Sequence, residues 1–240
     1  MSSLSETDFD IVIAGGGMIG VSMALAIASL NLRIAVIEKV ERDHDLQPSF
    51  DDRSTALSRS SQSMYTALGL WDEIRDTSEA IKSIHVSDQG RFGFSHISAK
   101  EQEVEALGYV VINRVLGDVL LANAEKKKNI KFFCPAEITS IESHKDYCNV
   151  NFKSHDVENI VSSRLLVVAD GANSSARDFL GIGTNKINYD QVAIIGNLLT
   201  EKAIDNRAFE RFSESGPLAL LPIENGRTAF IWIVPTNDAE

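Results

Sequence analysis

"FDIVIAGGGMIGVSMALAIASLNLRIAVIEK", residues 9–39, joins two apolar runs through three consecutive glycines. The pattern predicts a buried strand at 11–14, a helix at 18–30 and a second buried strand at 33–37. Only two or three residues link the helix to the second strand, which favours parallel pairing of the two strands in one sheet. The stretch therefore predicts a βαβ unit.

The glycines of this stretch form a G-x-G-x-x-G motif directly after a strand and at the opening of a helix. The first allows a tight turn, the second lets a pyrophosphate approach the backbone, and the third lets helix and strand pack closely. Glu38 ends the second strand, where its carboxylate can accept hydrogen bonds from an adenosine ribose and repel a 2'-phosphate. We expect an ADP-binding site at Gly15, Gly16, Gly17, Met18, Ile19, Gly20 and Glu38. The alternative is a packing turn beside a surface glutamate.

Composition excludes several classes of protein. The 240 residues are 44% hydrophobic, enough for a large core, and the net charge of -11 argues against a nucleic-acid backbone as partner. Cys134 and Cys148 lack the spacing of a metal site, so we expect two small hydrophobic side chains rather than a metal site or a disulfide. No secretory signal pattern or membrane span of about 20 apolar residues is visible. These features predict a cytoplasmic protein.

The rest of the chain combines two kinds of pattern, one of mixed helices and strands and one of consecutive strands. We expect a loop at 41–52, a helix at 54–68, a β-hairpin from "SIHVSD" and "FGFSHIS", a helix after Asn113, strands at "EITSI" and "YCNVNF", and a buried strand from Leu165. Beyond Gly183 four strand-like runs follow, with a hairpin turn at Asn225-Gly226.

The two kinds of pattern predict an α/β fold, α+β overall, in which a Rossmann-like nucleotide-binding domain accompanies an antiparallel sheet. The boundaries we expect are 1–80 and 104–183 for the first domain, and 81–103 and 184–240 for the second. Because the alternating βαβ pattern stops after Glu38, FAD is favoured over NAD.

Four segments in order resemble the fingerprints of the FAD-dependent aromatic hydroxylases of the para-hydroxybenzoate hydroxylase type. They are "GGGMIG" with Glu38, "DDRSTALS" around Arg53, "INRVLGDVL" around Arg114 and "LLVVADGANSSAR" ending at Arg177. The phrases "IHVSDQGRFG" and "RAFERFSESGPLALLP" are most similar to the members that act on prenylated phenols in ubiquinone biosynthesis.

The resemblance implies FAD as cofactor, NADH or NADPH as co-substrate, and hydroxylation of a prenylated phenol by O2. It implies that Arg53 and Arg114 contact the flavin side, and that Asp170 and Gly171 lie at the FAD ribose and pyrophosphate. The alternatives are a solvated loop arginine, an exposed first-turn arginine, and a helix cap at Asp170 with Arg177 in a surface ion pair.

A hydroxylase of this kind needs a dry site, and the segment 191–234 is the candidate wall. Candidate substrate contacts are Phe212, Pro217, Leu218, Leu220 and Pro222, with ordinary sheet core as the alternative. We nominate no general base, because no histidine has a recognisable partner. A prenylated substrate implies a ubiquinone-biosynthesis complex or peripheral contact with the inner membrane. The acidic chain favours protein partners over anionic lipid.

One departure limits the resemblance. The family's third FAD fingerprint, a Gly-Asp followed by small residues and a histidine, does not occur before Glu240. We therefore expect that the chain corresponds to the N-terminal part of such an enzyme and binds FAD weakly. A flavin reductase or dehydrogenase of the same fold, and a non-catalytic nucleotide-binding or assembly subunit, stay open as alternatives.

Overall fold

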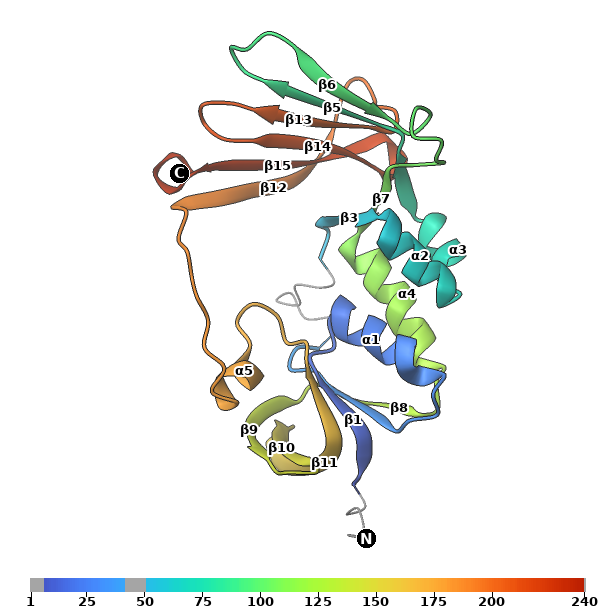
Figure 1. Ribbon diagram of the computed structural model, residues 1–240, viewed down its shortest axis with the longest axis vertical. Coiled ribbons are helices and arrows are strands. Elements are labelled where there is room, and N and C mark those ends of the chain that lie inside the picture. The colour runs from blue at the N-terminus through green and yellow to red at the C-terminus, as the bar shows by residue number, and fades with distance from the viewer. Residues whose placement is uncertain (1–6, 42–50, 240) are drawn as a thin grey trace. The chain divides into compact units, whose positions relative to one another are not determined.

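The computed structural model describes residues 7–41 and 51–239. The chain forms two compact units, one from residues 1–51 and 117–185 and the other from 52–116 and 186–240 (Figure 1). The sequence-based boundaries differ, since they place 52–80 and 104–116 in the nucleotide-binding domain. Assignment of these two segments to that domain stays a prediction. The loop expected at 41–52 lies largely outside the described residues.

The first unit contains a six-stranded sheet in the order β8-β2-β1-β11-β10-β9. Its elements are β1 (Phe9–Ala14), α1 (Met18–Ala28), β2 (Ile34–Ile37), β8 (Ile130–Phe133), β9 (Glu137–Ser143), β10 (Cys148–Ser154), β11 (Val157–Val168) and α5 (Ser175–Phe179). β8, β2, β1 and β11 are parallel, whereas β10 and β9 add antiparallel strands. The predicted βαβ unit is confirmed, because β1 and β2 pair in parallel on either side of α1 in sequence.

β11 is longer than the sequence indicated because it has two partners. Its first half, from Val157, pairs antiparallel with β10, and its second half, from Ser163, pairs in parallel with β1. Ser163 marks the change of partner, is fully buried, and donates its hydroxyl to the Leu165 carbonyl at 3.1 Å. The second half therefore carries Ala169 and Asp170 to the carboxyl end of β1.

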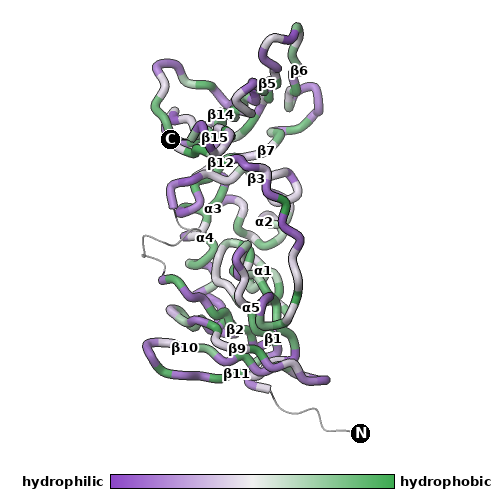
Figure 2. The backbone as a smooth tube through the Cα atoms, turned by 90° about the vertical axis from the view of Figure 1, so that its left-hand side faces the viewer, coloured by the Kyte–Doolittle hydropathy of each residue, from purple (hydrophilic) through white to green (hydrophobic). Residues whose placement is uncertain are grey.

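The core of the first unit lies on both sides of β1 and β2. Val12, Ile13, Ala35 and Val36 are completely buried, which explains why these strands are continuous apolar runs rather than alternating ones. Phe152, from β10, packs into the same cluster. Figure 2 shows these strands and α1 as predominantly hydrophobic segments. Burial of each large side chain contributes about 1.5–3 kcal/mol to stability.

The second unit is built on another six-stranded sheet, in the order β12-β15-β14-β13-β5-β6. Its strands are β5 (Ser83–Asp88), β6 (Phe94–Ser98), β12 (Gln191–Leu199), β13 (Arg207–Phe212), β14 (Leu218–Ile223) and β15 (Arg227–Pro235). Every neighbouring pair is antiparallel except β13 and β5. The predicted antiparallel sheet and the turn at Asn225-Gly226 are confirmed, with both turn residues at positive φ.

A smaller sheet, β3-β7-β4, corrects one expectation. The helix expected at 54–68 is wrong over its first five residues, because Ser54–Ser58 forms β3 and pairs with β7. The Ser58 hydroxyl accepts the Ser61 N–H, so α2 begins only at Arg59. The remaining elements are α2 (Arg59–Ala67), α3 (Trp71–Arg75), β4 (Ser78–Ile81), β7 (Gly108–Ile112) and α4 (Asn113–Glu125). Among the described residues, no helix has the length and apolar character needed to span a bilayer.

Candidate nucleotide site

The glycine loop starts where β1 ends. Gly15 has φ +101°, and its N–H donates to the Ile37 carbonyl at 2.8 Å, which ties the loop to the end of β2. A Cβ at Gly15 would lie 2.4 Å from the Ala169 carbonyl oxygen. Only glycine therefore permits both this backbone conformation and the close approach of the turn after β11.

The next glycines have separate structural reasons. A Cβ at Gly20 would lie 1.9 Å from the Gly15 carbonyl oxygen, so a side chain there would push α1 away from the loop. A Cβ at Gly16 would lie 2.8 Å from the Cβ of Glu38. Gly20 thus allows the helix to pack, whereas Gly16 leaves room for the acidic side chain.

The amino end of α1 is suited to an anion. Gly17 is the N-cap residue and supplies no side-chain acceptor, and the first turn, which includes Met18 and Ile19, contains no acidic side chain. The backbone N–H groups at the start of a helix and the helix dipole favour negative charge at this point. A pyrophosphate is the ligand that a glycine loop and helix start of this kind bind.

Glu38 faces the loop from the end of β2. Its Oε2 accepts the N–H of Gly16 at 2.5 Å, and its Oε1 accepts the N–H of Val40 at 2.8 Å. These two bonds fix the orientation of the carboxylate. Each oxygen has two lone pairs, so both can still accept a ribose hydroxyl.

Asp170 approaches the same place from the turn after β11. Its Oδ2 accepts the N–H of Ala176 at 3.0 Å, while its Oδ1 is buried and has no hydrogen-bond partner. The N-cap of α5 is Ser174, whose hydroxyl accepts the Arg177 N–H at 2.9 Å. Gly171 follows at φ +85°. The Oδ2 atom of Asp170 thus supports the start of α5, as the helix-cap alternative expected. The Oδ1 atom accepts no hydrogen bond from the protein.

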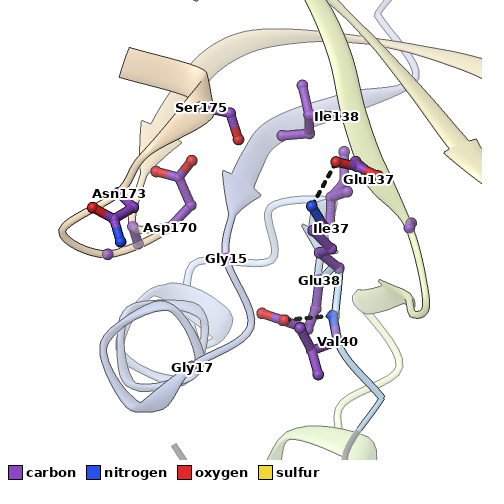
Figure 3. Close-up of a pocket in the computed structure, with 14 residues that line it drawn as sticks. Gly15, Gly17, Ile37, Glu38, Val40, Glu137, Ile138, Asp170, Asn173 and Ser175 are labelled. Carbon is purple, nitrogen blue, oxygen red and sulfur yellow. Dashed lines mark hydrogen bonds and ion pairs between the residues drawn. The ribbon is translucent and has the colours of Figure 1, made fainter. Parts of the chain in front are cut away.

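These groups surround one cavity of about 300 Å³ in the first unit (Figure 3). Its lining includes Gly15, Gly17, Glu38, Asp170 and Gly171 from the sequence prediction, and also Ile37, Lys39, Val40, Ala136, Glu137, Ile138, Ala169, Asn173 and Ser175. In Figure 3 the side chain of Asp170 lies beside Ser175, across the glycine loop from Glu38.

The sequence prediction missed the part of the lining at the start of β9. Lys39 and Glu137 form an ion pair, with 2.6 Å between Nζ and Oε1, and both side chains are more than half exposed. The pair connects the segment after β2 with the first residue of β9. Nothing in the local pattern around Glu137 indicates a ligand site, because its position depends on strand pairing far along the chain.

Arg53 and Arg114 lie in the second unit. The guanidinium of Arg114 donates to Oδ1 of Asp52 at 2.8 and 3.3 Å, and the Arg53 carbonyl accepts the Asn113 N–H at 2.8 Å. Arg114 is thus an exposed residue in the first turn of α4, as the alternative expected, and it is held by the carboxylate of Asp52. Contact of either arginine with a flavin stays a prediction.

The five candidate substrate contacts do not share one face. Leu218, Leu220 and Pro222 occupy every second position of β14, so their side chains share one face of the sheet. Arg211 of β13 pairs directly with Leu218 and has its side chain on that same face. Phe212, the next residue along β13, therefore points to the opposite face, and Pro217 precedes β14. A wall formed by Leu218 and Leu220 would instead include Trp232 and Phe230, their partners on β15. The role of these residues in substrate binding stays a prediction.

Comparison with protein families gives one match over nearly the whole chain. A family model described as "FAD binding domain" matches residues 8–240.

Individual proteins extend this result. The chain is 31% identical to ubiquinone hydroxylase UbiL of Rhodospirillum rubrum over 223 residues, covering 93% of this chain and 51% of the relative. It is 28% identical to 3-demethoxyubiquinol 3-hydroxylase of Escherichia coli over 228 residues, covering 93% and 56%. The chain therefore spans about half the length of these curated relatives. The crystal structure of p-nitrophenol 4-monooxygenase PnpA from Pseudomonas putida superposes with a TM-score of 0.81 at 16% identity, covering 96% of this chain and 59% of that one, and shows the same fold.

Proposed function

The chain belongs to the family of FAD-binding domains, and on this basis we propose that its glycine-loop cavity holds the ADP half of FAD for a hydroxylase of ubiquinone biosynthesis. The observation that carries the proposal is the convergence of three ligand groups on one cavity. The start of α1 is suited to the pyrophosphate, Glu38 to the adenosine ribose, and the unpaired Oδ1 of Asp170 to a sugar hydroxyl.

The residues present fit FAD on their own chemistry. The buried Oδ1 of Asp170 gains the hydrogen bond that it lacks, and the absent side chains at Gly15 and Gly16 leave the backbone open to phosphate. The fixed carboxylate of Glu38 disfavours a 2'-phosphate, so the adenosine site selects FAD over a 2'-phosphorylated dinucleotide. When bound, FAD supplies the redox chemistry that carries electrons from NADH or NADPH to O2.

The substrate we propose is a polyprenylated phenol, specifically 2-octaprenyl-6-methoxyphenol. The names of the curated relatives, a ubiquinone hydroxylase and a demethoxyubiquinol hydroxylase, support the substrate class. The half-buried side chains of Leu218, Leu220 and Phe230 share one face of the second unit's sheet and form an apolar surface suited to a prenyl chain. A polyprenylated phenol is poorly soluble in water. We therefore propose that the protein associates with other proteins of the pathway or makes peripheral contact with the inner membrane.

The test is the flavin content and product of the purified protein. Because weak FAD binding is expected of the chain, FAD is supplied in excess during purification. We then expect FAD in the released flavin fraction and incorporation of isotopically labelled O2 into a prenylated phenol when NADH or NADPH is added. Gly15→Val is expected to abolish flavin retention, while Glu142→Gln, an exposed change on β9, is expected to retain it. NAD(P)H turnover without labelled product contradicts the hydroxylase and favours a flavin reductase. Nucleotide binding without flavin retention favours a non-catalytic subunit.

A further inference from the structure

One edge of the second unit's sheet is a long strand without charged side chains. β12 ends the strand order of this sheet, and Figure 1 shows β12 and β6 at its opposite edges. The nine residues of β12, "QVAIIGNLL", include no acidic or basic residue, although the net charge of the chain is -11. The pairing of β12 with β15 runs from Gln191 to Leu199 without a bulge. The edge is therefore long, regular and uncharged.

The hydrogen bonds at the start of β12 show which of its backbone groups point outward. The Thr236 N–H donates to the Asp190 carbonyl at 2.9 Å, next to the pair formed by Gln191 and Pro235. This bond makes Gln191 and Pro235 a non-hydrogen-bonded pair, so every second residue from Gln191 directs its N–H and C=O away from β15. These residues are Gln191, Ala193, Ile195, Asn197 and Leu199. Their backbone groups have no strand partner in the part of the chain that the structure describes.

The side chains of β12 do not protect this edge. Natural sheets protect exposed edge strands with charged side chains, proline or bulges. The edge strand β9 of the first unit follows this rule, because it carries the exposed side chains of Glu137 and Glu142. β12 instead carries exposed apolar side chains, with Ile195 and Leu198 each 45% exposed and Leu199 80% exposed. Its edge is therefore suited to pairing with another strand.

The opposite edge of the same sheet is less suited to pairing. β6 has only five residues. The Ala99 N–H donates to the Lys82 carbonyl at 2.8 Å beside the pair of Ser83 and Ser98, which directs the carbonyl of Ser98 outward. This carbonyl already accepts the Gln102 N–H at 3.1 Å. β12 is therefore the longer and more open of the two edges.

A second copy of β12 is complementary to the first. The five outward-directed residues are placed symmetrically about Ile195, so two antiparallel copies can be related by a two-fold axis at this residue. Ile195 then lies opposite Ile195 of the second copy, Ala193 opposite Asn197, and Gln191 opposite Leu199. No like charges meet at any of these positions. The Asn197 amide already donates to the Asp52 carbonyl of its own chain at 2.7 Å and needs no partner across the axis.

Gly196 adds shape complementarity to this pairing. A Cβ at Gly196 would lie 2.6 Å from a carbon of the Phe230 ring, so this ring covers the glycine. In the symmetric register Ile194 of the second copy lies opposite Gly196. Its side chain would therefore pack against the Phe230 ring, in the way that aromatic rings compensate for glycine at sheet edges.

We propose that two copies of the chain pair antiparallel through β12 and form one continuous sheet across a two-fold axis. The inference goes beyond the proposed function and is independent of it, because it depends only on the sheet of the second unit. Sedimentation velocity of the purified chain over a concentration series tests it. We expect a monomer–dimer equilibrium without larger species, because a two-fold contact closes on itself.

A matched pair of lysine variants locates the contact. Ile195→Lys places two ammonium groups opposite each other at the axis and should weaken dimerisation at least about tenfold. The control is Ile97→Lys on the other edge strand, β6, where Ile97 is 42% exposed against 45% for Ile195. This variant should dimerise as the wild type does. Lysine is common on edge strands, and circular dichroism and thermal unfolding verify that both variants fold.

Cysteine cross-linking tests the register. The background variant is Cys134→Ser, which removes the exposed native thiol. Ile195→Cys should form a disulfide-linked dimer under mild oxidation, because directly opposed residues of paired strands lie within disulfide range. Gln191→Cys lies on the same edge, but in this register the two introduced cysteines are about 27 Å apart and should not cross-link.

Four outcomes overturn the proposal. The first is a monomer at every concentration, and the second is equal dimerisation by the wild type and Ile195→Lys. The third is a disulfide-linked dimer with Gln191→Cys but not with Ile195→Cys. The fourth is a series of larger species that Ile97→Lys abolishes, because this result assigns the contact to β12 of one copy and β6 of the next.

Discussion

The Oε2 atom of Glu38 lies 2.5 Å from the backbone nitrogen of Gly16 and accepts its hydrogen bond. This bond joins Glu38, the proposed ribose acceptor at the end of β2, to the loop that we propose binds the pyrophosphate. The shape of the glycine loop and the orientation of the carboxylate therefore depend on each other. A change at either residue should alter nucleotide affinity even where the fold is retained.

Glu38→Arg is expected to lower FAD affinity at least about tenfold, because the variant loses the carboxylate that accepts ribose hydroxyls. It should also lower the free energy of unfolding by roughly 1–3 kcal/mol, since the N–H groups of Gly16 and Val40 lose their charged acceptor. Flavin titration and denaturant unfolding measure the two effects. The surface variant Glu142→Gln is the control. If Glu38→Arg bound FAD with wild-type affinity, Glu38 would not be part of the nucleotide site.

Gly20→Ala should be far more damaging than Gly171→Ala. The added Cβ at Gly20 meets the Gly15 backbone oxygen at 1.9 Å, whereas nothing lies within 4 Å of a Cβ at Gly171. Alanine at Gly171 carries only the strain of a positive φ, about 1–2 kcal/mol. We expect Gly20→Ala to cost about 3 kcal/mol or more. Equal unfolding free energies for the two variants would contradict the packing role of Gly20.

Lys39→Met should speed release of the nucleotide, because the ion pair with Glu137 links the segment after β2 to the start of β9 within the lining of the cavity. Exposed ion pairs contribute about 0–1 kcal/mol, so the dissociation rate of FAD should rise no more than about fivefold. The difference from wild type should disappear at high salt, where exposed charges are screened. Lys153→Met removes an exposed pair with Asp156 on β10 and should have no effect. A salt-independent change at Lys39 would indicate another role.

Asp170→Asn and Asp170→Ala should separate two roles of one carboxylate. Asparagine can still accept the Ala176 N–H, so its unfolding free energy should stay near that of the wild type. Alanine leaves this N–H at the start of α5 without its acceptor and should cost about 1 kcal/mol. Both variants should bind FAD more weakly, because neither presents the free acceptor oxygen. Unchanged affinity in both would leave Asp170 as a structural residue only.

Glu210 predicts a stability that depends on pH. Burial raises the pKa of this carboxyl above its usual 4.5, so the folded state favours the protonated form. Ionisation of Glu210 therefore lowers the free energy of unfolding. This loss of stability is complete once the pH has risen through the folded pKa, and it is absent below the unfolded pKa. Glu210→Gln should therefore be more stable than wild type at neutral pH and equal to it in acid. Denaturant unfolding across this range measures the difference.

Asp8→Asn provides the opposite sign. The N–H and hydroxyl of Ser162 hydrogen-bond the Asp8 carboxylate and hold its pKa below the usual 3.8. The carboxylate therefore contributes stability above pH 3.8 that is lost as the pH falls through the folded pKa. The variant should be less stable than wild type at neutral pH, and the difference should disappear in strong acid. If the Asp8 and Glu210 variants changed the free energy of unfolding in the same direction at neutral pH, the causes assigned to the two pKa shifts would be contradicted.

Sequence was sufficient where the determinants are local. The unit of β1, α1 and β2 and the packing roles of Gly15 and Gly20 depend on residues within one short stretch, so motif and periodicity predicted them together. The turn at Asn225-Gly226 was predictable for the same reason, because two residues at positive φ specify it.

The parts that sequence missed depend on distant partners. Ser54–Ser58 resembles a helix start in isolation, yet it pairs with β7, whose residues lie about fifty positions later in the chain. Glu137 reaches the nucleotide cavity only because β9 joins the sheet through β10. Phe212 and Leu218 look like one apolar patch until strand register places them on opposite faces.

The most direct test of the central claim is a competition experiment on the purified chain. FAD binding is followed by flavin fluorescence while ADP or FMN is added. If the cavity formed by the glycine loop, Glu38 and Asp170 recognises the ADP half of the cofactor, ADP displaces FAD, FMN does not, and Glu38→Arg loses affinity for both FAD and ADP. Displacement by FMN but not by ADP would contradict the account.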